Sequence, residues 1–188
     1  MMVKFAVKFV LVLLFALAPS AAFAFTIQEV KSPGGITAWL VEDHEIPFVA
    51  LELRFKGGSS LDAPGKRGAI NLMTATLEEG AGDMNAQQFA EARETLAASY
   101  GFDVHDDALS VSSRFLTENR DQAVALLRLA LEKPRFDPDA VDRVRGQVLS
   151  ILRGNEKDPE TIASQAFNRL TFGDHPYGST GDGTSCWT

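Results

Sequence analysis

Residues 64–82 read Pro-Gly-Lys-Arg-Gly-Ala-Ile-Asn-Leu-Met-Thr-Ala-Thr-Leu-Glu-Glu-Gly-Ala-Gly. The glycines punctuate this stretch, because Gly68 precedes a run of helix-compatible residues and Gly80 follows it. We therefore predict a helix over residues 68–79. The adjacent carboxylates of Glu78 and Glu79 are of a type used in acid–base chemistry, but their place at the helix end favours exposed, solvated side chains.

Strands are predicted before this helix. Residues 26–31 and 36–42 flank Pro33-Gly34-Gly35, a turn signal. Residues 48–56 alternate between polar and apolar side chains, the period of a strand with one buried face. The residues expected on that face are Val49, Leu51, Leu53 and Phe55.

The remaining chain mixes helices and strands. We predict helices over residues 86–99, with Asn85 as N-cap, and over 120–132. A further helix begins at Asp137-Pro138 and stops at Asp158-Pro159, and the last covers 160–171. Strands are predicted at 102–105 and 109–115, around an Asp106-Asp107 turn. This order indicates an α+β fold, a largely antiparallel sheet with helices packed on one face.

The N-terminus has the pattern of a secretory signal peptide. Lys4 and Lys8 flank an apolar core over residues 9–17, and Ala22-Phe23-Ala24 is a small-x-small cleavage site. The apolar run is shorter than the roughly 20 residues that span a bilayer. We predict a signal peptide over 1–24 cleaved after Ala24, a domain over 25–172, and an irregular tail over 173–188. The product would be periplasmic or secreted.

Composition narrows the classes of partner. The chain carries a net charge of −7 at pH 7 and contains no basic run, which argues against nucleic acid and anionic lipid as ligands. Once the signal peptide is removed, no segment is expected to associate with a membrane. Cys186 is the single cysteine, so no internal disulfide can form and the core alone must hold the domain.

Several segments, in their order, resemble the pitrilysin/insulinase family of zinc metallopeptidases. Phe-Lys-Gly-Gly-Ser-Ser-Leu-Asp-Ala-Pro-Gly-Lys-Arg-Gly (55–68) is similar to the family's approach to its zinc helix. The other segments are Val-Glu-Asp-His-Glu-Ile-Pro-Phe-Val (41–49), Leu-Glu-Lys-Pro-Arg-Phe-Asp (131–137), Lys-Asp-Pro (157–159) and Asp-His-Pro-Tyr-Gly (174–178). The resemblance implies one insulinase-like α+β unit.

The resemblance also locates the family's zinc site and indicates that it is degenerate here. The H-x-x-E-H motif falls on Asn71 and Ala75 for the histidines and on Thr74 for the catalytic Glu. The third ligand, a Glu eight residues before a Pro, falls on Ile151, which we expect on a buried apolar stripe with Val141, Val144 and Val148. We therefore predict no metal, no cofactor and no catalytic residues. The family's activity would be zinc metalloendopeptidase, and we expect this chain to be inactive on its own.

No other pattern suggests a reactive site. The three histidines, His44, His105 and His175, show no ligand spacing and are expected to be surface or loop residues. Ser59-Ser60 is interpreted as a turn and Cys186 as a tail thiol.

The resemblance suggests a function. In the family's two-chain branch, one subunit carries zinc and its partner has lost it, and the partner's second half supplies an Arg and a Tyr to the active site. We hypothesise that this chain is similar to the non-catalytic partner, binding extended peptide alongside a zinc-bearing homologous subunit. The strand at 48–56 could pair with peptide or be a closed structural strand. Two alternatives stay open: a truncated product of a disrupted reading frame, or a stand-alone exported binding module.

Overall fold

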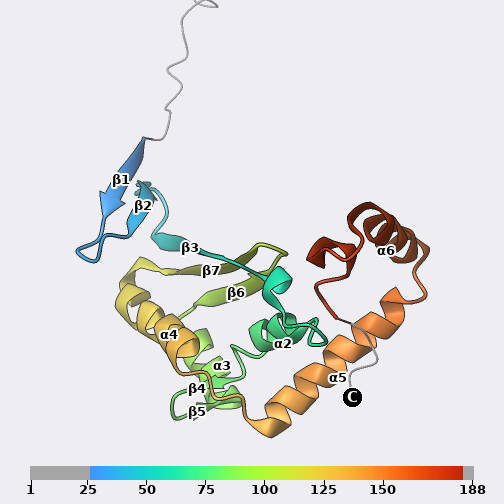
Figure 1. The fold of residues 1–188 in the computed structure, drawn as a ribbon. Coiled ribbons are helices and arrows are strands. Elements are labelled where there is room, and N and C mark those ends of the chain that lie inside the picture. Colours follow the sequence, from blue (N-terminus) through green and yellow to red (C-terminus); the bar gives the residue numbers. More distant parts are fainter. Residues whose placement is uncertain (1–25, 184–188) are drawn as a thin grey trace, which may run out of the picture. The chain divides into compact units, whose positions relative to one another are not determined.

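The computed structural model describes residues 26–183 (Figure 1). The predicted signal peptide over 1–24 and the thiol of Cys186 lie outside the described residues. The chain forms two compact units, Met1–Ile46 and Pro47–Thr188, which are described separately. In the part that is described, no helix is long and apolar enough to cross a membrane.

The described part of the first unit is a β-hairpin. Strand β1 (Ile27–Lys31) pairs antiparallel with β2 (Thr37–Val41), which confirms the two predicted strands to within one residue at each end. All residues of both strands are exposed, and Trp39 is 81% exposed. A two-stranded hairpin is at best marginally stable by itself.

The second unit is built on a three-stranded antiparallel sheet. The strands are β3 (Phe48–Lys56), β6 (Ser99–Val104) and β7 (Ala108–Leu116), in the order β3-β7-β6. β7 is therefore central, and β3 and β6 form the edges of this sheet. Leu53 and Phe102 both lie opposite Val111, which puts apolar side chains from all three strands on one face.

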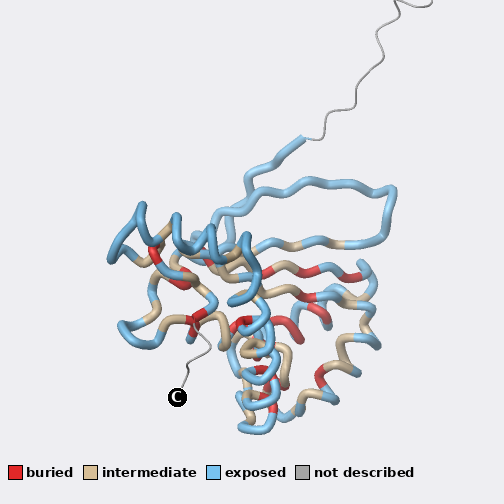
Figure 2. Tube along the Cα trace, turned by 90° about the vertical axis from the view of Figure 1, so that its right-hand side faces the viewer, coloured by how far each residue is buried: buried red, intermediate tan, exposed pale blue. Residues whose placement is uncertain are grey.

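Helices cover that apolar face. α3 (Ala86–Thr95) and α4 (Arg120–Glu132) lie on the same side of the sheet (Figure 1). Buried residues gather between these layers (Figure 2), in a core of Phe89, Val111, Leu126, Leu127 and Ala130 together with Ala81 and Tyr100. The predicted α+β architecture is confirmed.

Local signals explain several element boundaries. The Asn85 side chain accepts from the Gln88 backbone N–H, and the Gln88 side chain accepts from the Asn85 backbone, so the predicted N-cap is part of a capping box. Just before it, β4 (Gly80–Ala81) and β5 (Met84–Asn85) form a small hairpin that the sequence did not predict.

Pro138 starts α5 (Pro138–Asn155) as expected. The Asp137 side chain does not cap this helix, however, because it pairs with Arg135 at 2.7 Å.

Two predicted helices are shorter in the structure. α2 (Ala69–Ala75) ends at Ala75 rather than at residue 79. Just beyond its end, the Thr76 hydroxyl donates to the carbonyls of Leu72 and Met73. α3 stops at Thr95 rather than residue 99, and Ala97 just beyond it has a positive φ of 49°. A left-handed residue cannot continue a right-handed helix.

Burial corrects two sequence predictions. α5 buries Ala140, Val144 and Leu152, whereas Ile151 is 63% exposed. Of the predicted stripe, Val144 is buried and Val141 and Val148 are partly buried, so only Ile151 departs from the prediction, and it is not a core residue. On β3, Val49, Leu51 and Leu53 are partly buried as expected. Phe55, next to the end of the strand and outside the core cluster, is 47% exposed.

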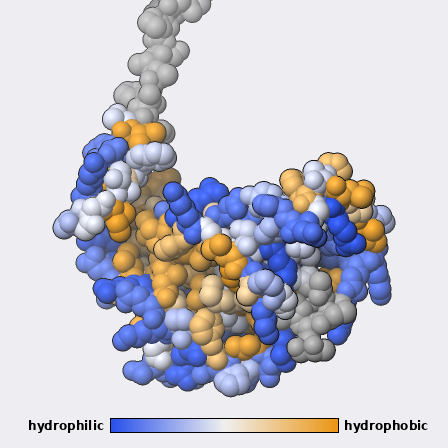
Figure 3. Space-filling model, in the orientation of Figure 1, coloured by the Kyte–Doolittle hydropathy of each residue, from blue (hydrophilic) through white to orange (hydrophobic). Residues whose placement is uncertain are grey.

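The last helix, α6 (Pro159–Phe172), buries none of its residues. Asp158 caps it, accepting from the Thr161 backbone N–H at 2.8 Å. Apolar side chains gather on the surface over this helix (Figure 3). Leu170 is 88% exposed, Phe167 66% and Ile162 49%.

Candidate functional site

The start of α2 is held by a side chain that the sequence did not reveal. Gly68 precedes the helix with a φ of 94°, a conformation that glycine adopts without steric cost. Because glycine has no capping side chain, Asp62 takes this role from the preceding loop. Its carboxylate accepts from the backbone N–H of Gly68 at 2.7 Å and of Ile70 at 3.0 Å. Negative charge at a helix N-terminus is favourable.

The three predicted slots on α2 have different surroundings. Thr74 is 3% exposed, and its hydroxyl donates to the Ile70 carbonyl at 2.6 Å. Ala75 is exposed, and Asn71 is partly buried with its amide 3.4 Å from the Asp182 carboxylate. None of the three supplies the thiolate, imidazole or carboxylate that binds zinc, so this donor set does not fit the ion.

Ile151 lies on α5, which packs against α2. Its side chain is apolar and largely exposed, and offers no metal ligand. No group of three or more His, Cys, Asp or Glu residues within 26–183 is placed to hold a metal ion. Among the histidines, His44 lies 3.9 Å from Glu42 in the first unit, whereas His105 and His175 belong to the second.

Glu78 and Glu79 are not the solvated pair that the sequence suggested. Glu78 pairs with Arg93 of α3 at 2.6 Å, and Glu79 pairs with Arg143 of α5 through two contacts of 2.6 and 3.2 Å. Their side chains are 30% and 21% exposed. The hydrogen bonds that Arg143 donates to Glu79 raise the pKa of Arg143. These carboxylates therefore join the end of α2 to two other helices.

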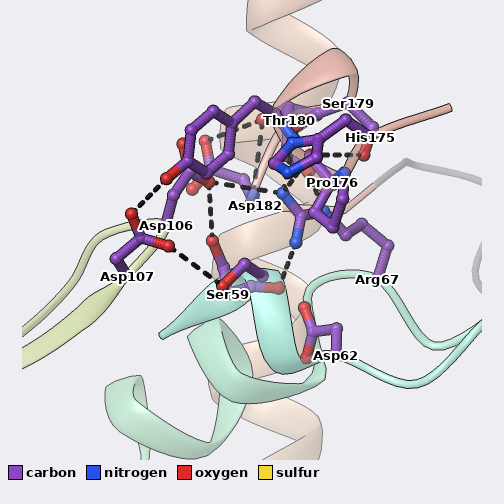
Figure 4. A network of polar contacts seen from close by, with 12 residues as sticks. Ser59, Asp62, Arg67, Asp106, Asp107, His175, Pro176, Ser179, Thr180 and Asp182 are labelled. Carbon is purple, nitrogen blue, oxygen red and sulfur yellow. Dashed lines mark hydrogen bonds and ion pairs between the residues drawn. The ribbon is translucent and has the colours of Figure 1, made fainter. Parts of the chain in front are cut away.

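Arg67 is the centre of a polar network beside α2 (Figure 4). Its guanidinium donates to the Ser59 carbonyl and to the carbonyls of Pro176, Ser179 and Thr180 at 2.9, 3.1 and 3.1 Å. It also lies 3.4 Å from the Asp106 carboxylate, and its side chain is only 18% exposed. Ser59, in the 3₁₀ turn η1 (Ser59–Leu61), donates to Asp106 at 3.1 Å, so the predicted Ser59-Ser60 turn is confirmed.

The described part of the predicted tail contributes to this network. It contains the 3₁₀ turn η3 (Pro176–Gly178). The Tyr177 hydroxyl donates to Asp107, and this hydrogen bond raises the pKa of Tyr177. His175 packs edge-on against the Tyr177 ring with a centroid distance of 4.5 Å.

A polar cavity of about 520 Å³ lies beside the network. The ends of α5 and α6, the Asp106 turn and residues 177–182 line it. Four of the lining residues are acidic: Asp106, Asp158, Glu160 and Asp182. Leu152 is the main apolar contribution. Sequence reasoning missed this cavity and Arg67, because the residues involved are far apart in the chain, 113 positions for Arg67 and Thr180, and share no local pattern.

Comparison with known proteins identifies the family. Residues 37–184 match the model of the family described as Insulinase (Peptidase family M16). The chain belongs to this family, as its segments from 41–49 to 174–178 suggested.

Individual relatives agree with this assignment. The chain is 29% identical over 163 residues to the non-peptidase homolog YmxG of Helicobacter pylori, covering 87% of this chain and 38% of the relative. A crystal structure of a peptidase M16 inactive domain from Pseudomonas fluorescens is 29% identical with a TM-score of 0.79, over 85% of this chain and 39% of that one. A protease from Helicobacter pylori, 16% identical with a TM-score of 0.74, shares the fold over 88% of this chain and 41% of its own. The chain thus spans about two fifths of the length of these relatives.

Proposed function

We propose that this chain is a non-catalytic member of the insulinase family that works as a partner and peptide-binding subunit of an exported zinc peptidase. The proposal rests on α2, where Asn71, Thr74 and Ala75 stand at the positions that the resemblance assigns to the two histidines and the base of the family motif. Residues four apart share a helix face, but here that face offers an amide and a methyl group. Two relatives named as a non-peptidase homolog and an inactive domain support the same assignment.

The partner role is supported by exposed apolar surface. Phe167 and Leu170 of α6 are 66% and 88% exposed. Contiguous apolar surface on a soluble domain marks an interaction site. The occupant we propose is the zinc-bearing homologous subunit.

The peptide-binding role is supported by the sheet edges of the second unit. β3 and β6 are the outer strands of the order β3-β7-β6, and an exposed edge can accept an extended peptide as an additional strand. β3 corresponds to the strand at 48–56 that the sequence suggested for this role.

Metal analysis tests the non-catalytic assignment. We expect purified protein to contain no stoichiometric zinc and to leave an unstructured peptide uncleaved. A variant with Asn71→His, Thr74→Glu, Ala75→His and Ile151→Glu should gain zinc affinity in isothermal titration, because it restores three ligands and a base. The matched control keeps Ala75 and changes the other three positions, and should bind at least about tenfold more weakly, because one ligand is missing. Stoichiometric zinc and unaided cleavage by the unmodified chain would refute the proposal.

Co-expression tests the partner role. We expect a homologous subunit with an intact H-x-x-E-H motif, encoded in the same genome, to co-purify with the tagged chain. Leu170→Lys should abolish this co-purification without changing the melting temperature, whereas Lys157→Ala should leave it intact. Equal recovery with both variants would exclude α6 as the contact surface.

Export is proposed from residues 1–24. Cell fractionation followed by intact-mass measurement should find a periplasmic or secreted species that starts at Phe25. A cytoplasmic species that retains Met1 would contradict this part of the proposal.

A further inference from the structure

We propose that Arg67 is a latch that keeps residues 176–183, here called the C-terminal strap, closed against the start of α2, and that the strap opens as one unit when the latch is released. Arg67 and the strap both belong to the second unit, and opening of the strap requires neither the partner role nor peptide binding.

The contacts of Arg67 are concentrated on the strap. Nε donates to the Thr180 carbonyl, and one terminal nitrogen donates to the carbonyls of Pro176 and Ser179. The other terminal nitrogen donates to Ser59, on the opposite side of the guanidinium. A single side chain thus ties three strap carbonyls to the η1 turn (Figure 4). Hydrogen bonds from a charged donor are about twice as strong as neutral ones.

Arginine suits this role for a geometric reason. Its planar guanidinium carries five N–H donors in a fixed arrangement, whereas lysine carries three on one rotating nitrogen. Four carbonyls and the Asp106 carboxylate surround the Arg67 group. Lysine could not reach these acceptors on both sides at once.

Apart from the bond from the Gly178 backbone N–H to the His175 carbonyl at 2.7 Å, the other polar bonds of the strap are long or exposed. The Ser179 and Gly183 backbone N–H groups donate within the strap at 3.3 and 3.5 Å. The Asn71 amide donates to Asp182 at 3.4 Å. The Tyr177 hydroxyl donates to Asp107 at an exposed position. Arg67, which is mostly buried, is therefore the principal fastening.

Close backbone packing makes the closed state specific. A Cβ atom added at Gly181 would lie 2.5 Å from the Ser59 hydroxyl oxygen, and one added at Gly178 would lie 2.2 Å from the Gly173 carbonyl oxygen. Distances below 3.0 Å cannot be accommodated without movement. The strap must lie this close for its carbonyls to reach Arg67.

Opening of the strap would change two surfaces together. Residues 177–182 line the 520 Å³ cavity, and Asp182 contacts Asn71 on α2. Release of the latch would remove one wall of the cavity and uncover the Asn71 side of α2. Arg67 thereby controls access to both.

Hydrogen exchange of the full chain, followed by mass spectrometry, tests the latch. In Arg67→Lys we expect amide exchange over residues 176–183 to rise at least about tenfold, because several charge-assisted bonds are lost, while β6 and β7 keep their protection. Chymotrypsin should cleave after Tyr177 faster by a similar factor. The control Arg128→Ala removes an exposed pair with Glu132 on α4 and should change neither measurement.

A second variant separates the latch from general destabilisation. Gly181→Ala pushes the strap away from Ser59 and leaves Arg67 in place, so it should reproduce the selective exchange of residues 176–183. The proposal is overturned if Arg67→Lys leaves strap exchange unchanged. It is equally overturned if Arg67→Lys and Gly181→Ala both raise exchange in the strap and in β6 and β7 by the same factor, because the strap would then not open separately.

Discussion

At the residue scale, Thr74 is the most instructive position. The resemblance places the family's catalytic Glu at this position, and Thr74 is 3% exposed with its hydroxyl donating to the Ile70 carbonyl. The side chain has become part of the helix and its packing. A carboxylate at this position would be desolvated with no metal beside it.

Thr74→Glu alone should therefore destabilise the protein by about 3 kcal/mol or more, because an uncompensated buried charge is costly. Urea unfolding at pH 7 measures the change. The near-isosteric Thr74→Val should cost clearly less, since it removes one hydrogen bond without adding charge. Equal stabilities for the Glu variant and the unmodified chain would show that Thr74 is not confined as described.

Substitution of Ser113 is expected to change stability in the opposite direction, as a gain. It lies on the core face of β7 opposite Leu51, it is 5% exposed, and its hydroxyl oxygen has no hydrogen-bond partner. Since an unsatisfied buried hydroxyl costs about 1–3 kcal/mol, Ser113→Ala should stabilise the protein by about 1 kcal/mol. Thermal unfolding checks this. Ser110→Ala, on the other face of the same strand, is the matched control with little expected effect.

At the element scale, sequence patterns predicted some segments closely and others only in part. The predicted segments 48–56 and 120–132 match β3 and α4 residue for residue. The first alternates strictly between polar and apolar side chains, and the second is followed closely by Pro134, so the bounds of both are well defined. The helix over 68–79 was too long, since the hydroxyl of Thr76 binds backbone carbonyls in a way that hydropathy does not reveal. The exposure of Ile151 was missed because a periodic stripe defines a helix face without showing how much of it other elements cover.

The capping box at α3 should contribute measurably to stability. Asn85 and Gln88 satisfy one another's backbone N–H groups at 3.0 Å each. Asn85→Ala should cost about 1 kcal/mol in denaturant unfolding. The neighbouring Gln87→Ala loses only an exposed bond to Glu91 and should be close to neutral. A loss confined to Gln87→Ala would contradict the capping role.

The N-terminus of α6 should respond to pH. Hydrogen bonds from the Thr161 side chain and then its backbone lower the pKa of Asp158 below its usual 3.8. A lowered pKa means that the stabilisation is present above pH 3.8 and is lost as the pH falls through the lower, folded value. The stability difference between the unmodified chain and Asp158→Ala should therefore shrink below pH 3.8, as measured by urea unfolding at several pH values. A difference that grows in acid would have the wrong sign.

At the scale of the whole molecule, the candidate site was only half predictable. Asn71, Thr74 and Ala75 came from one contiguous motif. The Arg67 network joins residue 67 to residues 176–180, and only the folded chain brings these positions together. The paired arginines of Glu78 and Glu79 were missed for the same reason, because they belong to α3 and α5.

Phe89 tests the single core of the second unit. It is fully buried between α3 and the sheet and packs against Tyr100 with a centroid distance of 6.4 Å. Phe89→Ala should lower the free energy of unfolding by about 3–5 kcal/mol. Unfolding should remain a single cooperative transition. Leu170→Ala, at an 88% exposed position, should change the free energy of unfolding by less than about 0.5 kcal/mol.

The buried packing of Tyr100 also provides a built-in optical reporter. Burial, followed by the nearby Glu78 charge, raises the pKa of Tyr100 to about 12, and its hydroxyl donates to the Ala123 carbonyl. The other tyrosine of the chain, Tyr177, sits in the C-terminal strap, and its bond to Asp107 also raises its pKa. Detachment of residues 176–183 would remove the bond to Asp107, so it should lower the pKa of Tyr177 and leave that of Tyr100 unchanged. Phenolate absorption during an alkaline titration would then register opening of the strap without any label, as ionisation that begins at lower pH.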